Sequence, residues 1–274
     1  MRSAGQEAFG LNEYAVPIHP TAIVDINAEI HDSALIGPYC TIGAKVHIGA
    51  RTELKANLYI DGPTWIGEDN IFYPYSSIGV ASQDKKYAGE YAETRIGNSN
   101  TIREFVTINR GTKGGGALTQ IGNDNWIMAY VHIAHDAIVG NHCILGNSVT
   151  FAGHVTVEDY ANIGAFSGLH QYCRVGRSAI IGGYSGAITQ DVLPYSITVA
   201  KREVKTFGAN RIGMERRGIS NESIEALQTA LRLLTRGKLN TTQAIAKIRE
   251  ELPGSPELEQ LLEFIRTAER GFVK

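Results

Sequence analysis

Residues 36–53 read IGPYCT, IGAKVH, IGARTE, three hexads that each begin with isoleucine and glycine. An isoleucine, leucine, valine or phenylalanine recurs at every sixth position over three stretches, from Ile18 to Ile78, from Ile96 to Ile108 and from Ile121 to Ile181. A helix with 3.6 residues per turn or a strand with a period of two cannot keep one face apolar over such a series. A coil with three flat sides can, because each side takes one hexad. The period therefore predicts a β-helix.

The fourth residue after each of these apolar positions is small and uncharged almost throughout, as at Ala34, and Leu58 is the large exception. Both positions are expected to point into a narrow triangular interior, where one large and one small side chain fill each side. All three cysteines belong to the small class: Cys40, Cys143 and Cys173. We therefore predict buried structural thiols, and neither disulfides, metal ligands nor a nucleophile.

These hexads, with IGEDNI at residues 66–71 and IGNSNT at residues 96–101, resemble the hexapeptide-repeat acyltransferase family. The resemblance implies a left-handed parallel β-helix. Three hexads then form one coil, so residues 18 apart lie one above the other, about 4.8 Å away. Residues 79–95 and 109–120 break the count and are predicted to be loops, which are frequent carriers of function on rigid scaffolds.

The hexad pattern stops after about residue 190. We predict an N-terminal extension over residues 1–17, the β-helix over residues 18–200 and a C-terminal α-helical domain over residues 201–274. An Asn240 to Gln243 capping pair and Ser255 before Pro256 mark helix starts. The predicted helices cover about 221–236, 241–252 and 256–270. A cyclic homotrimer is also expected, because the family resemblance implies one and because packed prisms supply deep clefts.

Composition excludes some classes of protein. The formal net charge of −2 leaves no basic excess to neutralise phosphates, which argues against nucleic-acid binding. Glu7 and Glu13 interrupt the first sixteen residues, so no signal peptide is predicted, and no apolar run has the length of a membrane span. We therefore expect a cytoplasmic protein without stable membrane insertion.

The segment from His132 to His154, HIAHDAIVGNHCILGNSVTFAGH, places polar residues in two neighbouring columns of the coil. One column holds His135, Gly153 and Gln171, and the next holds Asp136, His154 and Tyr172. A histidine beside a carboxylate suits a general base, because imidazole titrates near neutral pH. A glycine N–H can approach a reacting centre closely, as an oxyanion donor must. Taken alone, however, such a pair is more often a solvated surface pair.

Seven further segments carry a more specific resemblance. They are QDKKYAGE (83–90), RGTKGGG (110–116), HIAHD (132–136), CILGN (143–147), AGHV (152–155), HQYC (170–173) and GGYSG (182–186). Together they resemble the family of acyl carrier protein to UDP-N-acetylglucosamine acyltransferases, which begin lipid A biosynthesis. The resemblance implies direct transfer of a (3R)-3-hydroxyacyl group from acyl carrier protein to the sugar 3-hydroxyl. No cofactor is expected beyond the phosphopantetheine that the acyl carrier protein carries.

Residue roles follow from this resemblance. It makes His135 the general base, Asp136 the residue that orients it, and Gly153 the oxyanion donor. The residues implied to line the sugar site are His132, His154, His170 and Gln171, while Asp84 and Lys86 would reach across from a neighbouring subunit. The residues implied to hold nucleotide phosphate or carrier protein are Asn210, Arg216 and Arg217. Gly183 matches the end of the family's acyl groove, where a small residue leaves room for a long chain.

Two positions depart from the family pattern, and alternatives remain open. Ile212 stands where many relatives have an acidic residue, which leaves the uridine or ribose contact open, and Asn109 replaces a histidine common in the second loop. A sister enzyme acylating a 3-amino UDP-sugar or another hexapeptide acyltransferase is the nearest rival. A zinc hydratase on the same fold, with His132, His135 and His154 as ligands, is a different class. A scaffold trimer without activity would have no reason to stack these polar residues.

Overall fold

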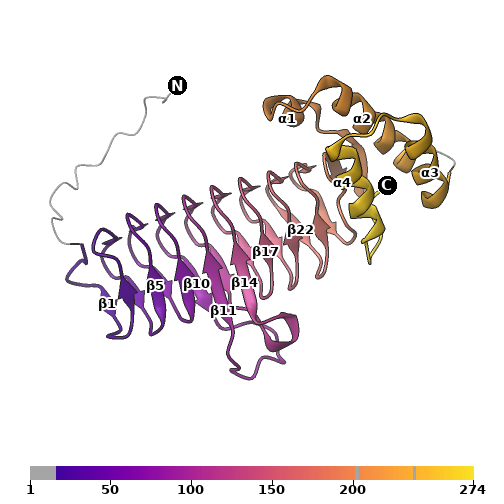
Figure 1. Cartoon of the computed structure of the whole chain (residues 1–274). Coiled ribbons are helices and arrows are strands. Elements are labelled where there is room, and N and C mark those ends of the chain that lie inside the picture. The colour runs from indigo at the N-terminus through magenta and orange to yellow at the C-terminus, as the bar shows by residue number, and fades with distance from the viewer. Residues whose placement is uncertain (1–16, 201–203, 237–238) are drawn as a thin grey trace.

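The computed structural model describes residues 17–200, 204–236 and 239–274. Apart from Pro17, the predicted N-terminal extension therefore lies outside the described residues. The rest forms a long prism of stacked coils with a group of helices at its C-terminal end (Figure 1). Among the described residues, no helix has both the length and the apolar character needed to cross a membrane.

Three sheets form the sides of the prism, and strands three apart in the sequence are neighbours as far as β25. The nine-stranded sheet contains β1 (Ile23–Val24), β4 (Thr41–Ile42), β7 (Tyr59–Ile60), β10 (Ser77–Val80), β13 (Thr107–Asn109), β16 (His132–Ile133), β19 (Thr150–Phe151), β22 (Ser167–Leu169) and β25 (Gly186–Ile188). The eight-stranded sheet contains β2 (Glu29–Ile30), β5 (Val46–Ile48), β8 (Thr64–Ile66), β11 (Glu93–Ile96), β14 (Leu118–Ile121), β17 (Ile138–Val139), β20 (Thr156–Val157) and β23 (Arg174–Val175). The ten-stranded sheet contains β3 (Leu35–Ile36), β6 (Glu53–Leu54), β9 (Ile71–Phe72), β12 (Thr101–Ile102), β15 (Trp126–Ile127), β18 (Ile144–Leu145), β21 (Asn162–Ile163), β24 (Ile180–Ile181), β26 (Ser196–Ala200) and β27 (Val204–Ala209).

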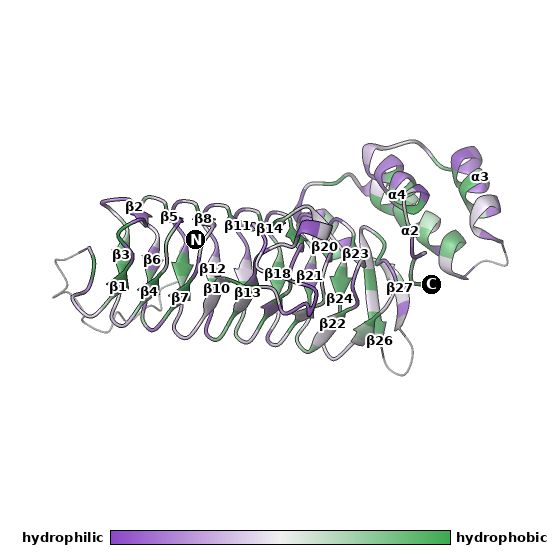
Figure 2. Cartoon of the chain, turned by 90° about the horizontal axis from the view of Figure 1, so that it is seen from below, coloured by the Kyte–Doolittle hydropathy of each residue, from purple (hydrophilic) through white to green (hydrophobic). Residues whose placement is uncertain are grey.

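The hexad positions build the core of the prism. From Ile36 to Ile181 the predicted apolar residues are buried, whereas Ile18 at the N-terminal end is 37% exposed. Hydrophobic residues recur from coil to coil along the strands (Figure 2). The three cysteines are buried and free, as predicted. Burial raises the pKa of Cys143 to about 12 and that of Cys173 to about 11, so neither thiol ionises readily near neutral pH.

The corners of the prism turn through residues in the left-handed region. Asp136, His154 and Tyr172 occupy one such corner column, with φ of 59°, 63° and 65°. This backbone conformation costs about 1–2 kcal/mol for a residue with a side chain, and Asp tolerates it better than most. At this corner the chain turns away from the strand, and the turn positions the side chains of Asp136, His154 and Tyr172.

An asparagine ladder runs through the interior and was not predicted. Asn70, Asn100 and Asn125 are buried in successive coils. The Asn100 side-chain Nδ2 donates to Asn70 Oδ1 at 2.9 Å, and Asn125 Nδ2 donates to Asn100 Oδ1 at 2.9 Å. Each amide thus hydrogen-bonds to the next one, and buried polar groups need such partners.

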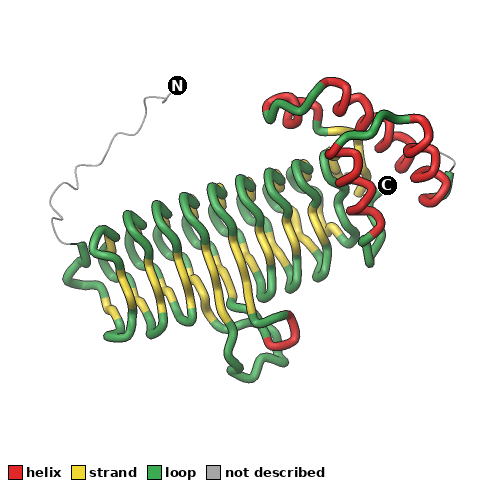
Figure 3. Tube along the Cα trace, in the orientation of Figure 1, coloured by secondary structure: helices red, strands yellow, loops and turns green. Residues whose placement is uncertain are grey.

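The two predicted loops are present. Residues 81–92 connect β10 to β11, and residues 110–117, with the short 3₁₀ helix η1 (Lys113–Gly115), connect β13 to β14. Both project from one side of the prism below β11 and β14 (Figures 1 and 3). Gly111 N–H of the second loop donates to the carbonyl of Glu93, the first residue of β11, at 3.2 Å, so the second loop is joined to the end of the first.

The C-terminal part contains α1 (Arg211–Arg216), α2 (Asn221–Arg236), α3 (Thr241–Glu251) and α4 (Pro256–Arg266). The predicted capping box of Asn240 and Gln243 and the Ser255 cap are confirmed. The helix expected over 256–270 ends at Arg266, because the chain turns back until Phe272 bridges Asp191 of the prism. The antiparallel β26–β27 pair and α1 were not predicted, and strand structure continues to Ala209.

Candidate active site

The centre of the site is the His135–Asp136 pair at the corner that follows β16. His135 Nδ1 lies 2.8 Å from Asp136 Oδ2. The His135 side chain is 12% exposed and that of Asp136 is 0% exposed. A carboxylate that accepts from Nδ1 leaves Nε2 as the outward nitrogen of the neutral ring, which is the tautomer that a general base needs.

Asp136 does not lie on an open wall, as the column pattern alone suggested, because the second loop covers it. Thr112 N–H donates to Asp136 Oδ1 at 2.8 Å, and the Thr112 hydroxyl donates to Oδ2 at 2.6 Å. A Cβ added at Gly115 would lie 2.1 Å from Asp136 Cγ, so the loop backbone packs directly on the carboxylate. The RGTKGGG segment marked this loop in the sequence, but no periodic signal assigned Thr112 to Asp136.

Gly153 lies under the His135 ring. A Cβ at Gly153 would be 2.4 Å from Cε1 and 2.6 Å from Nε2 of His135, so only glycine fits there. Within the described part of the chain, no acceptor takes the Gly153 N–H. A free N–H beside the outward nitrogen of His135 is the arrangement an oxyanion donor requires.

Two further histidines surround the pair. His154 stacks on Tyr172 with ring centroids 4.4 Å apart and meets the His135 ring edge-on at 5.1 Å. The Thr107 hydroxyl oxygen lies 2.7 Å from His132 Nδ1. Burial lowers the pKa of His132, with the His135 charge adding to the effect. Burial likewise lowers the pKa of His154, against an opposing effect of Asp136.

Of the remaining predicted sugar-site residues, Asp84 is half-buried and the others are exposed. The charge of Asp84 has the smallest of the four effects on the pKa of His154, and its reach to a neighbouring subunit stays a prediction. Lys86 is exposed and its N–H donates to Asp84 Oδ1 at 2.9 Å. His170 and Gln171 are exposed one coil beyond His154, and the Gln171 carbonyl accepts from Arg270 at 3.1 Å.

The donor atoms of His135, Asp136 and His154 lie within 4.8 Å of one another, which raises the question of a metal. Zinc needs ligand atoms aimed at one centre at about 2.0–2.2 Å. Here His135 Nδ1 is hydrogen-bonded directly to the carboxylate, and both Asp136 oxygens already accept from Thr112. His132 is not part of the cluster. The residues therefore form a hydrogen-bonded pair and do not fit the zinc alternative.

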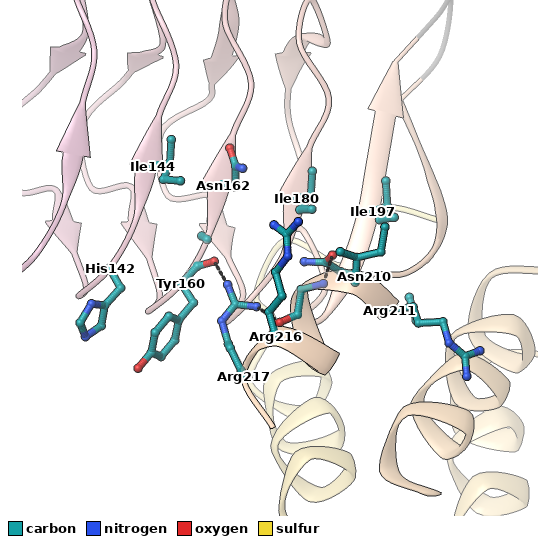
Figure 4. Close-up of a pocket in the computed structure, with 14 residues that line it drawn as sticks. His142, Ile144, Tyr160, Asn162, Ile180, Ile197, Asn210, Arg211, Arg216 and Arg217 are labelled. Carbon is teal, nitrogen blue, oxygen red and sulfur yellow. Dashed lines mark hydrogen bonds between the residues drawn. The ribbon is translucent and has the colours of Figure 1, made fainter. Parts of the chain in front are cut away.

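A separate cleft of about 750 Å³ lies between the ten-stranded sheet and α1 (Figure 4). Its apolar wall includes Ile144, Ile180 and Ile197, and Ile212 at its rim is 64% exposed. The predicted nucleotide or carrier-protein residues all line it: Asn210, Arg216 and Arg217. Ile212, the expected departure from the family pattern, thus lies at the rim of this cleft.

The three predicted residues of the cleft differ in what they can offer a ligand. Asn210 is buried and caps α1, accepting from Gly213 N–H at 3.2 Å and donating to the Ser178 carbonyl at 2.8 Å. The Arg217 guanidinium donates to the Gly213 and Tyr160 carbonyls and lies over the Tyr160 ring at 4.8 Å.

The Arg216 guanidinium is exposed and makes none of the hydrogen bonds or ion pairs found between described side chains. Arg216 is therefore the cation most available to a phosphate.

The two groups of predicted residues do not meet within one chain. His135, Asp136 and Gly153 are absent from the lining of the cleft that contains Arg216. Gly183 lies on the ten-stranded sheet's side, and a Cβ added there would be 3.5 Å from the nearest atom, the Ala165 carbonyl oxygen. The fold therefore tolerates a side chain at residue 183, so steric need within this chain does not explain the glycine.

Comparison with known proteins adds independent findings. A family model described as Udp N-acetylglucosamine O-acyltransferase, Domain 2, matches residues 191–273. A model described as bacterial transferase hexapeptide (six repeats) matches residues 118–153.

Proteins named acyl-(acyl-carrier-protein)–UDP-N-acetylglucosamine O-acyltransferase are similar over nearly their whole length. The one from Thermodesulfovibrio yellowstonii is 48% identical over 257 residues, which cover 94% of this chain and 99% of that protein. The one from Stenotrophomonas maltophilia strain R551-3 is 44% identical over 265 residues, which cover 96% of this chain and 100% of that protein.

Solved structures agree with the fold. The crystal structure of the UDP-N-acetylglucosamine O-acyltransferase from Moraxella catarrhalis is 42% identical, with a TM-score of 0.90 over 94% of this chain and 100% of that one. LpxA from Acinetobacter baumannii is also 42% identical, with a TM-score of 0.91. The predicted left-handed parallel β-helix with C-terminal helices is confirmed.

Proposed function

This chain belongs to the family of acyl-(acyl-carrier-protein)–UDP-N-acetylglucosamine O-acyltransferases, and from that membership we propose how its residues perform the reaction. It is an acyltransferase of the first step of lipid A biosynthesis, taking the acyl group from acyl carrier protein and giving it to UDP-N-acetylglucosamine. The relatives' names specify an O-acyltransferase and give no support to the 3-amino alternative. The acyl group is a (3R)-3-hydroxyacyl chain and the acceptor is the sugar 3-hydroxyl.

The observation that carries the mechanism is the buried Asp136 carboxylate bonded to His135 Nδ1 at 2.8 Å. His135 Nε2 removes the proton of the 3-hydroxyl as its oxygen attacks the thioester carbonyl. A carbon–oxygen bond forms, and the tetrahedral oxyanion accepts from Gly153 N–H. When the carbon–sulfur bond breaks, the imidazolium returns its proton to the departing phosphopantetheine thiolate. Asp136 stabilises the imidazolium between these steps.

Sugar recognition surrounds this centre. His132 and His154 are uncharged near neutral pH because burial lowers the pKa of each ring, and they serve as hydrogen-bonding groups to sugar hydroxyls. Asp84, Lys86, His170 and Gln171 complete the polar rim. The three cysteine thiols are buried in the prism, so none of them can act as a base on the sugar.

Nucleotide and carrier protein are held at the cleft beside α1. Arg216 pairs with phosphate, while Asn210 and Arg217 hold α1 in place through Ser178 and Tyr160. Because this cleft and His135 lie apart on one chain, a working site takes His135 from one subunit and Arg216 from another.

A homotrimer supplies that arrangement. Large exposed side chains along one corner of the prism support an association of subunits, since they form two aromatic stacks on the surface. They include Tyr75, Phe105, Tyr130, Phe166 and Tyr184. We also propose that the chain divides near residue 200 into a β-helix and a helical domain. The proposed location is the cytoplasm, which cell fractionation would test.

The reaction is tested by mass spectrometry of the product formed from UDP-N-acetylglucosamine and a panel of 3-hydroxyacyl carrier proteins. We expect a mass increase of one acyl chain with one preferred donor. His135→Ala should lower kcat by roughly 10²- to 10⁴-fold while assembly and melting are retained, because it removes the base alone. His31→Ala, an exposed histidine on the first coils, is the matched control.

In the same assay Gly183→Leu should move the preferred donor to a shorter chain, since the fold accepts a side chain there. A near-normal rate for His135→Ala would refute the base role. Absence of product with every donor would refute the proposed reaction itself.

A further inference from the structure

The Asp136 carboxylate has an unusual environment for a charged group, because none of its side-chain surface is exposed. Burying a charge is costly unless donors replace its water. The donors are Thr112 N–H to Oδ1, the Thr112 hydroxyl to Oδ2, and His135 Nδ1–H to Oδ2. Apart from His135 itself, both come from one residue of the second loop.

We propose that Thr112 is a positioning residue of the acyl transfer, the third member of a His135–Asp136–Thr112 relay. The inference rests on the proposed function, since it acts through the base assigned there. Thr112 touches neither the sugar nor the thioester in this role. It fixes the carboxylate so that Oδ2 faces His135 Nδ1, and the carboxylate in turn fixes the ring.

The geometry explains why one residue suffices. A carboxylate turns about its Cβ–Cγ bond with little resistance. Thr112 donates to both oxygens, one from its backbone and one from its hydroxyl, so a rotation would break two hydrogen bonds at once. The Asp136 backbone N–H is held by the Thr119 hydroxyl at 2.8 Å, which fixes the main chain beneath. Only the side-chain rotation is left for Thr112 to control.

Gly115 lets the loop approach closely enough to make these bonds. Its Cα faces the carboxylate, and an added Cβ would lie 2.1 Å from Cγ and 2.3 Å from Oδ2. The Thr112 carbonyl accepts from Gly115 N–H at 3.0 Å and Ala117 N–H at 2.8 Å, which closes the loop into a tight turn over Asp136. Such a turn also keeps water from the carboxylate.

The first loop supports this turn. Glu90 Oε2 accepts from Ala88 N–H at 2.8 Å and Oε1 accepts from Lys113 N–H at 3.3 Å, so the carboxylate bridges the two loops. Gly111 N–H adds a bond to the Glu93 carbonyl. Thr112 is thus held by neighbours on both sides, independently of substrate.

The test is a double-mutant cycle on the full-length enzyme with UDP-N-acetylglucosamine and its preferred acyl carrier protein. Thr112→Val keeps the shape of the side chain and removes the hydroxyl. We expect kcat to fall roughly 10- to 100-fold, with KM changed little, because a hydrogen bond to a buried charge is lost. Thr112→Ser should recover most of the rate. Thr41→Val, on β4 far from the site, is the matched control.

The cycle separates positioning from a structural role. In an Asp136→Ala background, Thr112→Val should change kcat less than twofold, because its target is gone. An equal loss in both backgrounds, or a normal rate for Thr112→Val, would overturn the inference. If Thr112→Val fails to fold, Gly115→Ala replaces it, with the same non-additivity expected. Product formation by the unmodified enzyme reports on the proposed function separately.

Discussion

At the scale of single residues, some contacts of the site can be predicted from the sequence and others cannot. The 18-residue repeat predicts that His135 lies above Gly153, and Gly153 does lie under the ring. The burial of Asp136 was not predictable in the same way. Its partner Thr112 belongs to a loop outside the repeat, and contacts between a loop and a coil follow no period.

Burial of His132 and His154 predicts how stability depends on pH. Each ring has a folded-state pKa below the ordinary value of about 6.5, so the unfolded chain takes up protons first as the pH falls. The contribution of the two neutral rings to stability is therefore fully present above the unfolded-state pKa of about 6.5. It is lost as the pH falls from that pKa through the lower folded-state pKa values. Urea unfolding between about pH 7.5 and 5 should show this decline.

A variant with both His132→Gln and His154→Gln should show a shallower decline than the unmodified chain. The Gln side chain keeps hydrogen-bonding capacity at both places but cannot take up a proton. Equal slopes for the two proteins would contradict the assignment of neutral buried rings.

At the scale of elements, the hexad period predicted the three-sided coil and the two loops, and capping residues predicted the three longer helices, because each leaves a regular pattern or a cap in the sequence. The β26–β27 pair has neither, and α1 is only six residues long, so its Asn210 cap precedes no periodic apolar pattern. The asparagine ladder was missed for a different reason: Asn70, Asn100 and Asn125 occupy the small inward position, and their partners are one another and backbone carbonyls of neighbouring coils.

The ladder gives a prediction about stability. Asn100 Nδ2 donates to Asn70 Oδ1 and the Gly122 carbonyl, and its Oδ1 accepts from Asn125. Asn100→Ala leaves these groups unpaired beside a small cavity, so it should lower the free energy of unfolding by about 2–4 kcal/mol. Urea unfolding measures it against Asn147→Ala, an exposed asparagine expected to change stability by less than about 0.5 kcal/mol. Equal effects would refute the role of the ladder.

At the scale of the whole molecule, the prism separates the two halves of the chemistry. His135, the proposed general base, lies at the corner after β16, and Arg216 lies in the cleft beside α1. The sequence identified both groups through the family resemblance, but no pattern in one chain says which copy completes which site. The spatial separation of His135 from the Arg216 cleft is what indicates that two subunits complete one site.

Mixing two inactive variants tests the shared site most directly. His135→Ala and Arg216→Ala subunits are unfolded together, refolded and checked for mixed trimers by native mass spectrometry. Each mixed trimer contains one interface with both intact residues, so random mixing should restore about a quarter of the unmodified activity. A mixture of His135→Ala with Asp136→Ala, which damage the same half, should restore none. No recovery with confirmed mixed trimers of the first pair would contradict a site built from two subunits.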